Sequence, residues 1–161
     1  TGSVTLNGVT LITFTQTDSE GSKTTVTYFD TRTGVAEQVG QRITDSSTGE
    51  ESLNIILSKT GGGYEETTSY KATESATPFT TTYNYDDNMV FTGGTEEVDG
   101  VTRTVNSDYS IASETANVSS LTAVSDTSGI APGAIASSGT IYKKENSYGD
   151  DKEITYFDSD G

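Results

Sequence analysis

The chain alternates short runs of β-branched and aromatic residues with turn-forming residues, which is the pattern of strands joined by tight hairpins. At the start, Val4–Leu6 and Val9–Leu11 flank Asn7-Gly8, a dipeptide suited to the two positive-φ positions of a type I′ turn. Ser52–Ser58 is the most apolar segment and is expected to be a central strand. The other expected strands of this part are Lys23–Asp30, Val35–Thr44, Tyr64–Lys71, Thr80–Asp86, Val90–Val98 and Val101–Val105.

The segment Ile111–Thr140 differs, because it is rich in Ala, Ser and Gly and contains no aromatic residue. It fits a flexible linker, a long loop, or a surface strand with small side chains. Partial packing by Leu121, Ile130 and Ile135 favours an ordered but irregular connection with one or two short strands. A last hairpin is expected after it, with strands at Thr140–Ser147 and Lys152–Phe157 joined by the turn-forming residues 148–151.

These patterns predict a single all-β domain over residues 1–161, antiparallel, either sandwich-like or an elongated multi-hairpin sheet. We expect little or no helix, because no window keeps an apolar period of 3.6 residues. Hydrophobic residues make up only 30% of the chain, and Thr and Ser take up the difference. Thr is β-branched and suits a half-exposed pleated surface, so the sheet is expected to have a thin core.

The charge of the chain limits the kinds of partner that it can bind. The chain carries 9 Lys plus Arg against 24 Asp plus Glu, a formal net charge of −15. Nucleic acids and anionic membrane surfaces would repel such a chain. No apolar stretch reaches the roughly 20 residues that span a bilayer, so no membrane insertion is expected. A divalent metal ion is the simplest cationic partner for such a chain.

The residue inventory also argues against common catalytic centres. Neither His nor Cys occurs, which removes Ser-His and Cys-His nucleophile pairs, disulfides and thiolate metal sites. A carboxylate pair could still hydrolyse glycosides, but no spacing singles one out. The 9 tyrosines could stack on sugar rings, although the absence of Trp favours a role as cross-strand packing partners. We expect the chain not to be an enzyme.

A short phrase, an aromatic residue followed by Asp at the end of a Thr-containing run, occurs three times. The copies end in Phe29-Asp30, Tyr85-Asp86 and Phe157-Asp158, and each runs on into turn-forming residues. The unequal spacing excludes a strict short-period solenoid. The repetition instead predicts a modular β scaffold whose strands end in acidic turns.

Two of these acidic turns are candidate calcium sites. Asp158 and Asp160 stand two residues apart beside Gly161, a spacing that lets both carboxylates converge on one hard cation. Asp86, Asp87 and Asn88 form a second candidate, in which a turn could gather two side chains and a backbone carbonyl. The alternative for both is a solvated acidic turn without metal. The sequon Asn117-Val118-Ser119 is common by chance in Ser/Thr-rich chains and carries little weight.

The segments Tyr156–Gly161 and Tyr85–Glu96 resemble phrases of secreted bacterial proteins of the calcium-dependent RTX and large-adhesin type. The nonapeptide repeat Gly-Gly-x-Gly-x-Asp, which defines the calcium β-roll, is missing here. The resemblance implies a secreted or cell-surface bacterial repeat protein that is stabilised by calcium.

The leading functional expectation is a structural or adhesive subunit that self-associates into a filament or repeat array by sharing edge strands. Thr1–Thr17 is the candidate donor, and the region ending at Phe157 is its candidate neighbour. The alternative is that each terminal strand pairs only within its own sheet. A module that binds glycans or a cell surface is the second function class, and a glycoside-acting enzyme is the third.

Overall fold

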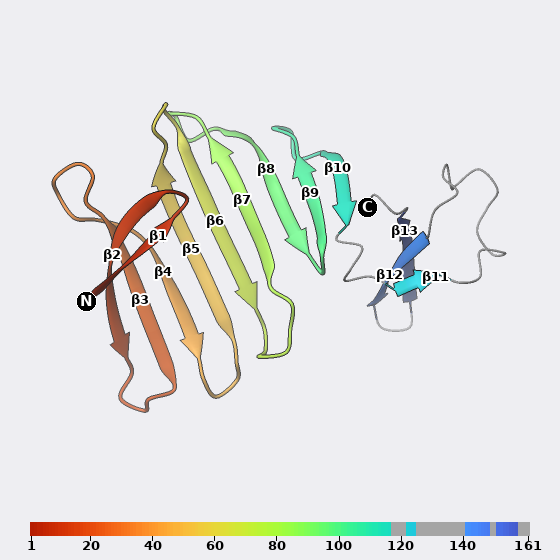
Figure 1. The fold of residues 1–161 in the computed structure, drawn as a ribbon, viewed down its shortest axis with the longest axis horizontal. Coiled ribbons are helices and arrows are strands. Elements are labelled where there is room, and N and C mark those ends of the chain that lie inside the picture. The colour runs from red at the N-terminus through yellow and green to blue at the C-terminus, as the bar shows by residue number, and fades with distance from the viewer. Residues whose placement is uncertain (117–121, 125–140, 149–150, 158–161) are drawn as a thin grey trace.

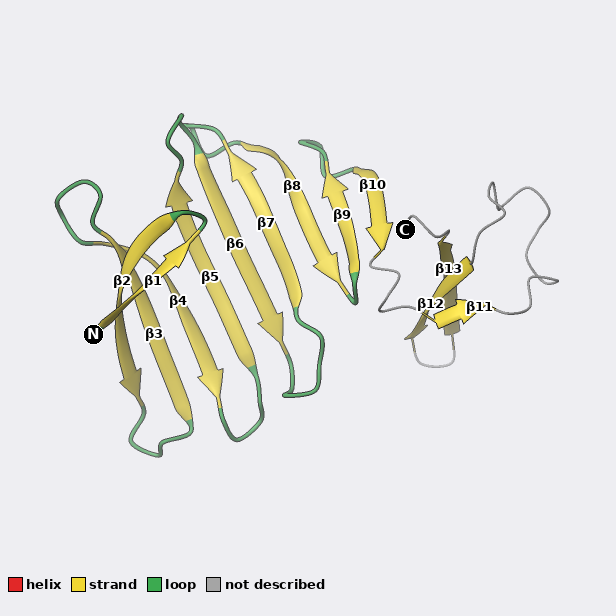
Figure 2. Ribbon diagram, viewed as in Figure 1, coloured by secondary structure: helices red, strands yellow, loops and turns green. Residues whose placement is uncertain are grey.

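The computed structural model describes residues 1–116, 122–124, 141–148 and 151–157, which form two antiparallel sheets without a helix (Figures 1 and 2). The all-β prediction is confirmed. The strands of the larger sheet are β1 (Gly2–Leu6), β2 (Val9–Thr17), β3 (Lys23–Asp30), β4 (Glu37–Asp45), β5 (Glu51–Ser58), β6 (Tyr64–Lys71), β7 (Phe79–Tyr85), β8 (Phe91–Val98), β9 (Val101–Val105) and β10 (Ile111–Ala116). The smaller sheet contains β11 (Thr122–Val124), β12 (Ile141–Tyr148) and β13 (Asp151–Phe157).

The larger sheet is a ten-stranded meander in which the spatial order of the strands equals their order in the chain. Each strand runs antiparallel to the next, so short hairpin turns suffice for the connections. Of the two architectures expected from the sequence, this is the elongated multi-hairpin sheet. At the first hairpin, Asn7 and Gly8 take φ angles of 48° and 78°, as a type I′ turn requires.

In the segment Ile111–Thr140, where one or two short strands were expected, the described residues form two. Ile111–Ala116 is β10, the last strand of the larger sheet, and it pairs with β9 with a register shift between Ile111 and Ser113. Most side chains of β10 are small, and Ser113 and Thr115 lie opposite Thr104 and Thr102 on β9. Small side chains therefore face small side chains across this strand pair. Thr122–Val124 supplies one further short strand. Residues 117–121 and 125–140, with Asn117, Leu121, Ile130 and Ile135, lie outside the described residues.

The main core lies on one face of the larger sheet at β5. Because side chains alternate between faces, Leu53, Ile55 and Leu57 share that face. The hairpin of β1 and β2 folds over them (Figure 1), and its Leu11 is completely buried with a 0% exposed fraction. The other core side chain is Tyr28, and Val4, Leu6, Val9, Val26 and Val39 pack around the cluster.

Gly40 on β4 allows the core to close, because it stands in register between Tyr28 of β3 and Ile55 of β5. A β-carbon at Gly40 would lie 2.1 Å from the carbonyl oxygen of Asn54, closer than any side chain permits. The register between β3 and β4 shifts just beyond Tyr28, leaving Val39 as the extra residue of a bulge. Bulges increase local strand twist, which suits a sheet that folds back on itself.

Beyond β5 the same face changes from apolar to hydroxyl-bearing. The residues that continue the register of Ile55 across β6 to β10 are Thr67, Thr82, Thr95, Thr104 and Ser113. We call these five residues the hydroxyl row. Three of its side chains, on β8 to β10, are exposed. The apolar residues of these strands lie instead on the opposite face, where Phe91, Val101, Val105 and Ala116 are buried.

Replacing Leu11 with Ala should test the cover that the first hairpin provides. We expect the free energy of unfolding to fall by about 2–5 kcal/mol, the usual cost of a Leu→Ala change in a core. The matched control is Ile12→Ala on the same strand but the opposite face, where the side chain is 44% exposed. That control should cost about 1 kcal/mol or less in urea denaturation. Equal losses for both variants would contradict a core placed under this hairpin.

Candidate functional site

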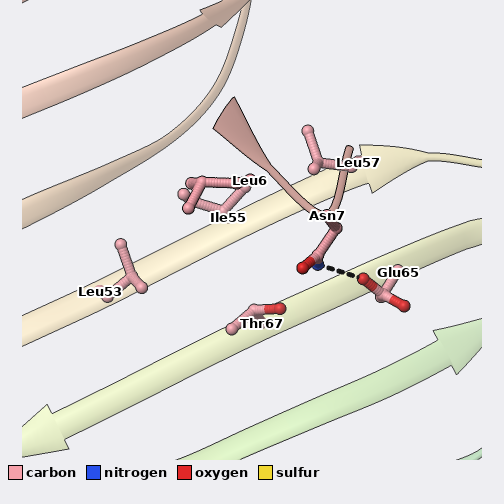
Figure 3. Close-up of a pocket in the computed structure, with 7 residues that line it drawn as sticks. All are labelled: Leu6, Asn7, Leu53, Ile55, Leu57, Glu65 and Thr67. Carbon is pink, nitrogen blue, oxygen red and sulfur yellow. Dashed lines mark hydrogen bonds between the residues drawn. The ribbon is translucent and has the colours of Figure 1, made fainter. Parts of the chain in front are cut away.

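A cleft opens where the first hairpin stops short of covering β6 (Figure 3). One side is apolar and the other polar, so the cleft lies at the edge of the core, where apolar side chains meet the polar strand β6. It is lined by Leu6, Asn7, Leu53, Ile55, Leu57, Glu65 and Thr67.

The two sides of the cleft come from different strands. Leu53, Ile55 and Leu57 occupy alternate positions of β5, while Leu6 overhangs them from the end of β1 (Figure 3). Each apolar residue therefore presents its side chain to the same space. The polar side is the neighbouring stretch of β6, which stands in register with Leu57 and Ile55.

The turn at the tip of the hairpin is attached to the sheet by one side-chain hydrogen bond. The Asn7 amide donates from Nδ2 to Oε1 of Glu65 on β6, across 58 positions of the chain (Figure 3). This contact closes one end of the cleft. It also satisfies one oxygen of Glu65, the carboxylate among the residues that line this cleft.

A second, more polar hollow shares Asn7, Leu57 and Glu65 with the cleft. Its two cations already have partners. Arg32 donates from Nη2 to Oδ2 of Asp30 at 2.6 Å and to the Ser58 carbonyl at 2.9 Å. Lys59 donates from Nζ to Oδ1 of Asn84 at 3.1 Å. The hollow extends the cleft with a polar rim rather than with unsatisfied charge.

Asp30 is buried, and Arg32 accounts for its ionised state. The guanidinium of Arg32 reaches it by Nε as well as Nη2, and the Arg32 backbone N–H donates to Oδ1 at 2.9 Å. These hydrogen bonds lower the pKa of Asp30, with the Arg32 side chain as the main cause. The pair holds the loop after β3 beside the end of β5.

The lining of the cleft combines apolar and polar groups, and it includes one carboxylate, that of Glu65. Its apolar side chains can receive apolar groups of a ligand, and its Asn, Glu and Thr can orient polar ones.

The predicted calcium ligands of the β7–β8 turn have partners within the protein. Asp86 Oδ1 accepts hydrogen bonds from the backbone N–H groups of Asn88 at 2.8 Å and Val90 at 2.9 Å. Asp87 Oδ1 accepts from the Gly63 N–H at 2.6 Å and so points toward the β5–β6 loop. The two carboxylates thus serve different backbone groups.

Within the part of the chain that the structure describes, no group of three or more acidic side chains could hold a metal ion. The other predicted pair, Asp158 and Asp160, lies outside the described residues. Calcium binding stays a prediction.

Aspartates organise several other loops in the same way as Asp86. Asp30, Asp45 and Asp108 each accept the backbone N–H of the residue two positions later, at 2.9, 2.9 and 3.0 Å. This is the Asx turn, in which a side chain replaces a backbone acceptor. The aromatic-Asp phrases at Phe29-Asp30 and Tyr85-Asp86 are therefore strand ends followed by Asx turns.

The opposite face carries an aromatic cluster around the buried Phe91. Tyr83 and Tyr85 meet its ring edge-on, at centroid distances of 5.0 and 6.0 Å. Their hydroxyls donate to Glu96 and Glu66, respectively. Tyr109 stacks on Phe91 at 4.4 Å and remains 64% exposed, so its ring is the one in this cluster most accessible to solvent.

No protein-family model, curated protein or solved structure matches this chain. The residues that the structure describes include no helix long and apolar enough to cross a bilayer.

Replacing Asp30 with Asn should remove a pH-dependent stabilisation. Because the folded pKa lies below the ordinary 3.8, the contribution is present above about pH 4 and is lost as pH falls through the folded value. We expect Asp30→Asn to cost about 1–2 kcal/mol at pH 7 and to flatten the acid limb of the stability curve. Glu51→Gln, in the more exposed Arg42 pair, is the control and should cost less. If the stability of Asp30→Asn fell with decreasing pH as steeply as that of the unaltered chain, Asp30 would not be a source of the pH dependence.

Two tyrosines should ionise at a higher pH than an ordinary tyrosine. The Glu96 hydrogen bond, with burial, raises the pKa of Tyr83 to about 12, and burial with the Glu66 hydrogen bond raises that of Tyr85 to about 12. Tyrosinate absorbance of the folded protein should therefore show a late component that Tyr83→Phe and Tyr85→Phe reduce. Since both values lie above the unfolded 10, stability should fall as pH rises from about 10 to 12. One transition near 10 for all tyrosines would contradict the cluster geometry.

Proposed function

We propose that this chain is a non-catalytic structural or adhesive subunit of a bacterial extracellular protein, which associates with neighbouring copies through its strand edges. The observation that carries the proposal is the ten-stranded meander, whose two end strands are β1 and β10. An open sheet of this kind offers a row of backbone donors and acceptors at each end, which is the chemistry of β-augmentation.

The β1 edge is the less protected of the two. Natural edge strands are shielded by Lys, Pro, bulges or a cover. Gly2–Leu6 contains no charged residue and no proline. At the other end, β10 carries Glu114 and an irregular register between Ile111 and Ser113. The first strand is therefore the better site for adding a further strand.

Calcium and secretion are parts of the same proposal. A net charge of −15 works against the close approach of like copies, and a divalent cation at the acidic turns would offset that repulsion. Ligand-linked stabilisation of about 2.7 kcal/mol at a hundredfold over the Kd would also be large for a thin core. The likeness of Tyr85–Glu96 to adhesin phrases supports a cell-surface or secreted setting.

A glycan- or surface-binding module is the second candidate, favoured by the exposed Tyr109 ring stacked on Phe91. Binding to specific glycans on an array by a monomeric protein, lost in Tyr109→Ala, would support it. An assembled protein that binds no glycan would support the structural subunit instead.

Sedimentation velocity in millimolar calcium, and again in excess chelator, tests the proposed function. We expect faster and heterogeneous sedimentation in calcium and a slower species in chelator. Assembly that is the same in both buffers would remove calcium from the proposal but keep the subunit. Identical monomer profiles in both would overturn assembly and the calcium role together.

A further inference from the structure

The tip of the first hairpin carries a chemically reactive pair of residues. Asn7-Gly8 is the one place in the chain where a glycine follows an asparagine. At such a pair, the backbone nitrogen of the glycine can attack the side-chain amide carbon of the asparagine, because the glycine has no side chain to hinder the approach. A five-membered succinimide ring then forms, and the amide nitrogen leaves as ammonia.

The turn leaves the attacking nitrogen accessible. Asn7 and Gly8 are both exposed, and a β-carbon added at Gly8 would meet no atom within 4 Å. A two-residue turn closes with a hydrogen bond between the residues that flank it, here Leu6 and Val9, so the backbone N–H of Gly8 takes no part in that bond. Neither neighbouring atoms nor the turn therefore engage this nitrogen.

The side-chain amide is the part of the pair that the fold restrains. Nδ2 of Asn7 donates to Oε1 of Glu65 on β6, and this contact holds the amide over the cleft (Figure 3). It limits the side-chain rotation that would bring the amide carbon to the Gly8 nitrogen. The same contact attaches the hairpin tip to the sheet, so the reacting group and the attachment are one side chain.

We propose that Asn7 is a site of spontaneous deamidation, and that the reaction releases the tip of the first hairpin from β6. The Gly8 nitrogen forms a bond to Cγ of Asn7, the Cγ–Nδ2 bond breaks, and a proton passes through solvent from the Gly8 nitrogen to the departing ammonia. Water then opens the ring at either of its carbonyl carbons. The product is an aspartate or an isoaspartate, and water is the only reagent consumed.

Either product places a second carboxylate beside Glu65. A carboxylate has no proton to donate to Glu65, and two carboxylates that share one site repel each other. The cations that line the adjoining hollow, Arg32 and Lys59, already have Asp30 and Asn84 as partners. Isoaspartate also lengthens the backbone of a turn that accommodates two residues. The hairpin tip therefore loses its attachment, and the cleft beneath it opens.

Peptide mapping by mass spectrometry, during incubation above neutral pH, locates the reaction. We expect aspartate and isoaspartate to accumulate at Asn7 before any other asparagine converts. The matched control in the same chain is Asn54, which donates from Nδ2 to Oε1 of Glu66 at 2.9 Å but is followed by Ile55 within β5. Glu65→Ala frees the Asn7 amide and should accelerate its conversion. Earlier conversion at another asparagine, or an unchanged rate in Glu65→Ala, would overturn the proposal.

Asn7→Asp reproduces the aspartate product and tests its effect on the hairpin. We expect a lower midpoint of urea denaturation than that of the unaltered chain at pH 7. The difference should shrink at about pH 3, where one carboxyl of the pair is protonated and can donate to the other. Adding Glu65→Gln should restore the midpoint at pH 7, because the new amide can donate to the new carboxylate.

The matched control for stability is Asn106→Asp, which loses a hydrogen bond to the Ser110 hydroxyl in another turn. It should lower the midpoint less and should gain nothing from Glu65→Gln. An Asn7→Asp chain as stable as the unaltered one, or a double variant no more stable than Asn7→Asp, would contradict release of the hairpin. Mapping uses the unaltered chain, so it decides where the reaction occurs even if a variant fails to fold. Neither expectation depends on how copies associate.

Discussion

The fold depends on the cover that one hairpin places over Leu53, Ile55 and Leu57. A single-layer sheet satisfies its backbone groups within the sheet, but it has no second layer to bury an apolar row. The first hairpin supplies that layer locally by folding back from its own sheet (Figure 1). Its short reach explains the cleft, because the turn ends at Asn7 and leaves the margin of the core open toward β6.

Much of this fold follows from local sequence. Asn7-Gly8 and Asp99-Gly100 are dipeptides that readily take the positive φ angles of a tight hairpin turn. The strands on either side lie where the alternation of apolar and polar residues predicts them. The choice of one sheet over a sandwich was not predictable. Tyr64–Lys71 has polar side chains on both faces and its aromatic residues, Tyr64 and Tyr70, on one face, a pattern that fits either architecture. Ile111–Ala116 lies in the segment where one or two short strands were expected, but its small and polar side chains show no apolar alternation that would place the bounds of the strand.

The site was less predictable than the fold. The spacing of Asp86 and Asp87 predicts a chelating turn, and the same turn also lets these carboxylates accept backbone N–H groups. Asp86 accepts the N–H of Asn88 in an Asx turn, and Asp87 accepts the N–H of Gly63 on the neighbouring loop. The cleft was missed altogether. Its one specific polar contact joins Asn7 to a residue 58 positions away, and no local pattern encodes such a pair. The apolar residues of β5 predict a central strand, but by themselves they do not predict a cleft.

The agreement between strand order and chain order has a mechanical consequence. Each strand of the larger sheet is hydrogen-bonded only to its neighbours in sequence, so the sheet is quasi-one-dimensional, like a repeat array. Under tension applied at the two ends of this sheet, the strands next to β10 can detach one after another without disturbing the core under the first hairpin. The strands up to β6 are cross-linked by that hairpin and yield as a block. The sheet is thus a graded tether, compliant at its C-terminal end and stiff at its N-terminal end.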